Sequence, residues 1–352
     1  MAPKKPINNE VDTKVSPGQL SILLEQFFLA RQTVMITGAP GIGKTDIVSA
    51  VANKLKMDMI VAHPVVDSPI DYKGLGFMDA KTGKADFFPF GNLRRVLEAE
   101  KPMVYFFDDL GQAPVAVQAA AMQMLLSRSI NGKKIPDCVT FCAATNRKED
   151  RAGVSGIIEP VKSRFCTIIE LVPEVNAWMS WALRNDIPPK LVGFIKFAPK
   201  YLTEFKPTQD MSNSPSPRTI AHTGRILHMK LPSSIQLAAL AGAAGSAFAH
   251  ELNAFLTVFD KLPDPQHILQ HPNELNIPAE SLDLRYAMTV SLATICTAPQ
   301  MPNFFKALSK WDKEFSVLGV EIAVRRDTKL VQTPAVMEFL QANKQVMFGI
   351  EF

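Results

Sequence analysis

The chain has 352 residues, of which 47% are hydrophobic and 20% charged, and its formal net charge is +4. This length is enough for about two domains with a sizeable core. The composition is that of a soluble globular protein. A net charge so close to neutral argues against strong electrostatic attraction to nucleic acid or to a membrane surface.

Cysteine usage and the N-terminal residues both favour a reducing, cytoplasmic setting. The four cysteines show no CxxC spacing, and we expect them to be small buried apolar residues. Residues 1–16 lack the apolar segment of a signal peptide, so we expect a polar tail there. The Ala-rich stretch Ile235–Ala249 is too short to span a bilayer, so no membrane insertion is expected.

The first chemical motif follows a short apolar segment, TVMIT at residues 33–37, which predicts a buried strand. The next eight residues, GAPGIGKT, satisfy the pattern GxxxxGK[ST], and an apolar stripe that includes Ile47 and Val51 predicts a helix after them. Strand, glycine-rich loop and helix are the context that a P-loop requires. We therefore expect a nucleotide-phosphate site made by Gly38, Ala39, Pro40, Gly41, Ile42, Gly43, Lys44, Thr45 and Asp46.

Two adjacent carboxylates follow a second buried strand. MVYFF at residues 103–107 leads directly into Asp108 and Asp109. If this strand lies beside the P-loop strand, Asp108 and Thr45 would hold Mg²⁺, and Asp109 would orient the attacking water. The alternative is that the acids cap the next helix, in whose first turn Pro114 would fit.

A third strand and two arginines complete the set of candidate residues. VTFCAAT at residues 139–145 ends at Asn146, which we expect at the same edge of the sheet. A helix is predicted over residues 154–162, and Arg164 follows it, before another strand at 166–171. Arg164 either complements that helix end or has a catalytic role. Further on, Ser216 and Pro217 predict a helix start with Arg218 in its first turn, where a bound phosphate would favour the cation.

This order of motifs resembles the AAA+ ATPases, and more narrowly their MoxR type, a phage and bacterial branch with an insert at the second helix. The segments that carry the resemblance are GAPGIGKT, FFDDL, ATNR, SRF and SPRT, and the stretch at residues 67–93 resembles that insert. The implied fold is an α/β P-loop AAA+ αβα sandwich with a five-stranded parallel sheet. An α-helical lid and a helical C-terminal region would follow it.

The resemblance also implies roles for the candidate residues and ATP with Mg²⁺ as cofactors. Asn146 would be sensor 1, Arg218 sensor 2, and Arg164 an arginine finger that acts in trans, with Arg151 as a second trans candidate. The acid pair departs from the family pattern, since Asp109 replaces the usual glutamate. Its carboxylate is one methylene shorter, which predicts slow turnover or a water held by a neighbouring group.

The implied protein is a ring, expected to be a hexamer, that hydrolyses ATP to remodel or activate a protein partner. The resemblance implies a partner with a von Willebrand factor A-like domain. Two alternatives stay open: a nucleic-acid-stimulated translocase, and a nucleotide-gated scaffold with little turnover.

The chain is predicted to begin with a polar tail at 1–16 and a nucleotide-binding core at 17–172, with the insert at about 68–91. A lid at 173–230 would follow, and a helical region at 231–352 would complete the lid or bind the partner.

The insert is expected to form a hairpin that turns near residues 81–84. Its aromatic side chains would either grip a polypeptide or anchor the hairpin to the core, and we favour anchoring. These aromatic residues are Phe77, Phe87, Phe88 and Phe90.

Overall fold

The computed structural model describes residues 13–78, 83–150, 156–207 and 211–343. The chain folds into two compact units, residues 1–172 and 173–352, which we call the first and the second unit. Within the described residues, we find no helix with the length and apolar character that crossing a membrane requires.

The first unit is built on a parallel sheet, and its strands in the described part of the chain run in the order β1-β10-β2-β9-β6-β3. The neighbouring strands β9 and β6 are buried along their whole length, as strands covered by helices on both faces must be. The strands are β1 (Lys14–Val15), β2 (Val34–Thr37), β3 (Asp58–Ala62), β6 (Met103–Phe107), β9 (Val139–Thr145) and β10 (Thr167–Leu171).

The predicted parallel sheet is confirmed, and β2, β6, β9 and β10 fall at the positions predicted from sequence. The fifth large strand is β3, which the sequence analysis did not locate. The two-residue strand β1 adds a sixth and lies in the segment expected to be a polar tail. One expectation is wrong: β6 does not lie beside β2, because β9 is between them.

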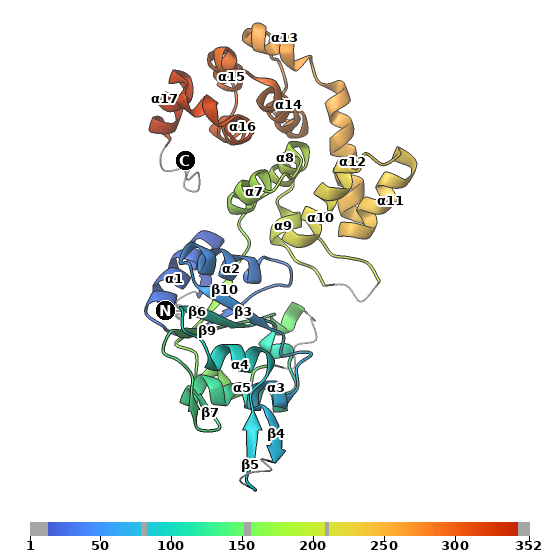
Figure 1. Cartoon of the computed structure of the whole chain (residues 1–352). Helices are drawn as coiled ribbons and strands as arrows, with labels where there is room; N and C mark the ends of the chain where they lie inside the picture. The colour runs from blue at the N-terminus through green and yellow to red at the C-terminus, as the bar shows by residue number, and fades with distance from the viewer. Residues whose placement is uncertain (1–12, 79–82, 151–155, 208–210, 344–352) are drawn as a thin grey trace, which may run out of the picture. The chain divides into compact units, whose positions relative to one another are not determined.

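Helices cover both faces of this sheet (Figure 1). On one face lie α1 (Pro17–Leu29) and α2 (Lys44–Lys54). On the other lie α3 (Pro69–Lys73), α4 (Gly91–Leu97) and α5 (Val115–Ser127), whose apolar side chains form one core with those of β6 and β9. Short 3-10 turns, η1 (Leu110–Gln112) and η2 (Lys148–Asp150), follow β6 and β9, and α6 (Glu159–Lys162) precedes β10.

Two antiparallel hairpins leave the first unit. The smaller joins β7 (Ser129–Ile130) to β8 (Lys133–Lys134) through Asn131 and Gly132, both with positive φ, as a tight hairpin turn requires. The larger pairs β4 (Leu75–Met78) with β5 (Ala85–Phe88) and is called the β4–β5 ribbon below. Part of its predicted turn, residues 79–82, lies outside the described residues.

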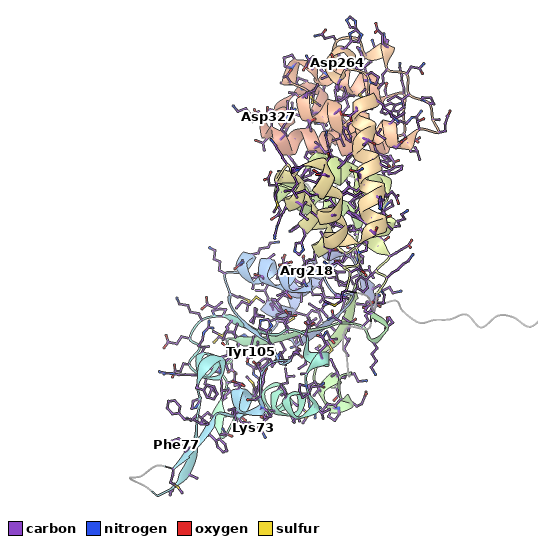
Figure 2. The ribbon with its side chains drawn as sticks, turned by 90° about the vertical axis from the view of Figure 1, so that its right-hand side faces the viewer. Lys73, Phe77, Tyr105, Arg218, Asp264 and Asp327 are labelled. Carbon is purple, nitrogen blue, oxygen red and sulfur yellow. The ribbon has the colours of Figure 1, made fainter. Side chains whose placement is uncertain are left out.

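The β4–β5 ribbon projects from the unit, and Figure 2 shows Phe77 along it. Every residue of both strands is exposed, with Phe77, Phe87 and Phe88 exposed by 42%, 44% and 54%. The expectation that these three rings anchor the hairpin to the core is therefore wrong. Phe77 and Phe88 instead pack edge to face with each other, with ring centroids 6.2 Å apart.

The second unit is helical in its described residues, as predicted, and has its own core. The buried side chains of α8, α14 and α16 belong to this core. The helices are α7 (Val175–Arg184), α8 (Pro189–Phe197), α9 (Lys200–Thr203), α10 (Pro217–His228), α11 (Ser233–Ala244), α12 (Ser246–Val258), α13 (Pro265–Gln270), α14 (Leu282–Ile295), α15 (Met301–Leu308), α16 (Lys313–Arg326) and α17 (Pro334–Ala342). Four 3-10 turns complete the described elements: η3 (Phe259–Lys261), η4 (Pro272–Glu274), η5 (Ala298–Gln300) and η6 (Thr328–Gln332).

Candidate functional site

The glycine-rich loop connects β2 to α2 in a conformation that only small residues allow. Gly38, Gly41 and Gly43 have φ angles of 152°, 75° and 94°, which disfavour residues with a Cβ. At Gly38 a Cβ would also lie 2.8 Å from the carbonyl oxygen of Leu171 and 2.6 Å from Cδ1 of Ile42. The first glycine therefore lets the loop begin directly against the end of β10.

Lys44, the first residue of α2, turns back into the loop. Its side chain is buried, and Nζ donates hydrogen bonds to the carbonyl oxygens of Gly38 and Ala39, both at 3.0 Å. A third bond of 2.7 Å goes to Oδ1 of Asn146 at the end of β9. The ammonium group thus lies at the N-terminus of α2, where anions are favoured.

Thr45 and Asp108 bring oxygen atoms from two elements together. Thr45 Oγ1 donates to Oδ2 of Asp108 over 2.9 Å. Asp108 is held at the end of β6 because its N–H donates to the carbonyl oxygen of Ala62 in β3. A hydroxyl and a carboxylate are the ligands that Mg²⁺ prefers, so this pair fits the predicted metal site.

Asn146 also contacts the second acid. Its Nδ2 donates to Oδ1 of Asp109 over 3.0 Å, while its Oδ1 accepts from Lys44. Asp109 has φ 56° and precedes η1 without a side-chain capping bond, and the N-cap of α5 is Pro114. The alternative in which the two acids cap the following helix is therefore not what the structure has.

These side chains meet at the carboxyl edge of the sheet. The strands β2, β9 and β6 are neighbours, and they are followed directly by Gly38, Asn146 and Asp108. The chain adds β9 on one side of β2 and then β10 on the other. Such a reversal opens a crevice at the carboxyl ends of the strands, which is where α/β sheets bind ligands.

Arg164 lies apart from this group of hydrogen bonds. The helix before it, α6, begins at Glu159 and not at the predicted residue 154, and Gly156 has φ 98°. Arg164 Nη1 donates to Oγ of Ser163 over 3.3 Å, and its carbonyl accepts from Thr33 Oγ1. Its Nε is buried without a hydrogen-bond partner in the described residues. Arg151 lies outside the described residues.

Arg218 belongs to the second unit and occupies the predicted place in the first turn of α10. The N-cap is Ser216, whose Oγ accepts from the N–H of Thr219, and Pro217 is the first helical residue. The P-loop residues belong to the first unit.

The sequence analysis overlooked Arg147, the residue after Asn146. Its guanidinium forms hydrogen bonds to Asp150 and Glu170. An acid three residues after an arginine was a visible signal for the first pair. The second pair depends on strand order, which the sequence did not reveal.

Comparison with known proteins identifies the fold of this part of the chain. Residues 34–172 match the model of the ATPase family associated with various cellular activities (AAA). The matched range contains the glycine-rich loop, both acids, Asn146 and Arg164. No curated protein matches the sequence.

Solved structures show weaker likenesses. A mutant of RuvB from Thermotoga maritima is 16% identical with a TM-score of 0.41, over 75% of this chain and 78% of that one. NtrX from Brucella abortus in complex with ADP is 14% identical with a TM-score of 0.40, over 92% and 67% of the two chains. The match of residues 34–172 to the AAA model is thus the comparison that bears on the fold: this part of the chain has the AAA+ P-loop fold.

Proposed function

We propose that this chain is an Mg²⁺-dependent ATPase, and a subunit of a ring-forming AAA+ motor that remodels or activates a protein partner. The observation that carries the proposal is the connected group of Lys44, Asn146 and Asp109, with Thr45 and Asp108 beside it. These five side chains come together at this edge of the sheet, whereas the arginines that were expected from the sequence and that the structure describes do not belong to this group.

The phosphates would lie over the glycine-rich loop and the first turn of α2. Backbone N–H groups of the loop would bind phosphate oxygens, and Lys44 would exchange its bonds to the loop carbonyls for the β- and γ-phosphates. Thr45 and Asp108 would hold Mg²⁺, which supplies charge neutralisation between those phosphates.

Water attack requires a group that orients the nucleophile. Asp109 is the candidate base, because it follows Asp108 directly after β6 and its Oδ1 accepts a hydrogen bond from the amide of Asn146. Asn146 can donate either to this carboxylate or to a phosphate oxygen. On ATP binding, we expect Asn146 to contact the γ-phosphate and to free Asp109 for the water.

We further propose that the site is completed by arginines. Arg164 would act on the ATP of a neighbouring subunit, as MoxR-type resemblance implies, and Arg218 would serve as sensor 2 from the lid. Arginine fingers contribute about 10³–10⁵-fold to hydrolysis, so an isolated subunit would be nearly inactive. A hexamer and a partner with a von Willebrand factor A-like domain are the expected assembly and client.

Mixing two inactive variants tests both hydrolysis and the shared site. Lys44→Ala subunits should fail to bind nucleotide, and Arg164→Ala subunits should fail to act on a neighbour's ATP. Their mixture should recover ATPase activity that neither has alone. The matched control mixes Arg164→Ala with the double variant Lys44→Ala/Arg164→Ala, where no recovery is expected.

Two results would count against the proposal. Wild-type protein that neither binds nor hydrolyses ATP in any oligomeric state would refute the ATPase. An active wild type whose variants do not complement each other would refute the trans role of Arg164 alone.

A nucleotide-gated scaffold with little turnover is the second candidate, because the base is the short Asp109 and not a glutamate. For this candidate, ATP would drive assembly while Asp109→Asn left the steady-state rate unchanged. A nucleic-acid translocase has weaker support, because the chain is nearly neutral; it would use exposed lysines such as Lys133 of the β7–β8 hairpin. Salt-sensitive stimulation of the ATPase by DNA would favour it.

A further inference from the structure

Arg147 makes the densest set of charged hydrogen bonds near the site. Its Nε and Nη2 donate to the two oxygens of Asp150 over 2.9 and 2.8 Å, and Nη1 donates to Oε1 of Glu170 over 3.0 Å. These bonds, first those to Asp150, raise the pKa of the guanidinium, although burial opposes this.

The pair with Asp150 closes a tight turn directly after Asn146. The Asp150 side chain is 3% exposed, and a buried carboxylate requires a partner. The N–H of Asp150 also donates to the carbonyl oxygen of Arg147. Because the fork geometry of arginine matches both carboxylate oxygens, it limits the turn to one arrangement.

The pair with Glu170 connects this turn to a different strand. Glu170 lies in β10, opposite Thr37 of β2, and Thr37 lies opposite Thr145 of β9. The ion pair therefore joins the two strands that flank the P-loop strand. Leu171, next to Glu170, is the residue whose backbone Gly38 approaches closely.

Resting on the proposed ATPase function, we propose that Arg147 is a positioning residue for Asn146. Its bond to Glu170 connects the turn after β9 to β10, on the other side of β2. This connection fixes the position of Asn146 relative to the P-loop. A purely structural ion pair is the alternative. It would affect folding, ATP binding and turnover to the same degree. A positioning role would act on turnover, because Asn146 must meet the γ-phosphate and water at a defined distance.

Two conservative variants test this. Arg147→Lys keeps the charge but cannot form the fork, and Glu170→Gln removes the charge at nearly constant shape. Arg94→Lys is the matched control, since Arg94 also bonds both oxygens of a glutamate, Glu98, on the exposed face of α4. ATP affinity, kcat, KM and the midpoint of thermal unfolding are measured for the full chain.

Both test variants should lose kcat by about 10- to 100-fold, because a misplacement of about 1 Å has that effect. ATP affinity should stay close to that of the control in both variants. The unfolding midpoint should do so in Glu170→Gln, whereas Arg147→Lys should lower it because the buried Asp150 keeps only one bond. The double variant Arg147→Lys/Glu170→Gln should lose little more than either single one, since both act through one contact.

Turnover equal to the control, or a parallel loss of stability, binding and turnover, would overturn the positioning role. Neither of these two results would contradict the proposed ATPase function. That function fails only if the wild-type protein lacks ATP binding and hydrolysis.

Discussion

Asn146 contacts both a cation and an anion, Lys44 and Asp109, through the two ends of one amide. Its position was predictable because an apolar run ends there. Its partners also follow from chemistry, since the amide oxygen must face the ammonium and the nitrogen the carboxylate. Arg147, one residue later, was not predictable in the same way, because its bond to Glu170 depends on the order of the strands.

Asp109 is the residue at which the chain departs from the pattern it resembles. Asp109→Asn should lower kcat by about 10²-fold or more, as expected for loss of a catalytic base. Asp109→Glu should raise kcat above that of wild type, because the longer side chain reaches further towards the water. Steady-state ATPase rates measure both.

The control is Asp137→Asn, which removes an exposed carboxylate paired with Lys134 and should leave the rate unchanged. If Asp109→Asn turns over as fast as wild type, Asp109 is not the base and the scaffold becomes the better description.

At the scale of elements, strands with continuous apolar runs were predictable, and those with mixed patterns were not. β6 and β9 are buried throughout and were found from sequence. β3 alternates in burial and begins with an exposed aspartate. Its sequence therefore has no continuous apolar run that would distinguish it from the residues around it. β1 has two residues and is held by pairing with β10, which no local pattern records. The predicted helix at 154–162 was too long because Gly156 has positive φ.

Glycine substitutions should have opposite effects in two elements. Gly38→Ala places a Cβ against Leu171 and Ile42, and should both destabilise the first unit and weaken ATP binding. Gly18→Ala in α1 meets nothing within 4 Å and should stabilise the protein by about 0.5–1 kcal/mol. Urea unfolding followed by circular dichroism tests both. Equal changes in the free energy of unfolding for the two variants would contradict the close approach of Gly38 to Leu171.

Helix α16 carries a buried acid, Glu321, whose pKa is raised to about 7 by burial, while Lys196 of α8 and Arg325 lower it. The folded state therefore binds a proton more tightly than the unfolded state, so stability falls as pH rises through 7. As the pH rises from about 6 to 8.5, deprotonation of Glu321 should lower the free energy of unfolding by about 1 kcal/mol.

Glu321→Gln should remove this part of the pH dependence and make the protein more stable at pH 8.5. Urea unfolding at both pH values, followed by tryptophan fluorescence, measures it. Glu338→Gln, at an exposed position of α17, is the control and should keep the wild-type dependence. If the free energy of unfolding of Glu321→Gln changes with pH as much as that of wild type, the raised pKa of Glu321 is contradicted.

At the scale of the whole molecule, the P-loop motif and the tryptophan residues lie in different units. The P-loop and both acids belong to the first unit, whereas all three tryptophans, Trp178, Trp181 and Trp311, belong to the second. β10 ends at Leu171, and the second unit begins at residue 173. A nucleotide effect on tryptophan emission would therefore report transmission from one unit to the other.

Addition of ATP should change the tryptophan emission of wild-type protein, and Lys44→Ala should show no change. Arg147→Lys should bind ATP and give a smaller change, because the bond between residue 147 and Glu170 of β10 is weakened. Titrations with ATP and with ADP measure the amplitude and the midpoint. A full amplitude in Arg147→Lys would show that the signal does not travel through β10.

The β4–β5 ribbon makes one region of the first unit vulnerable to digestion. Two-stranded ribbons are only marginally stable in water, and here Phe77, Phe87 and Phe88 are exposed, so local opening offers chymotrypsin its preferred aromatic sites. Phe107 and Phe141, fully buried in the sheet, should resist cleavage while the unit stays folded. Brief digestion should therefore nick the chain first at Phe77, Phe87 or Phe88.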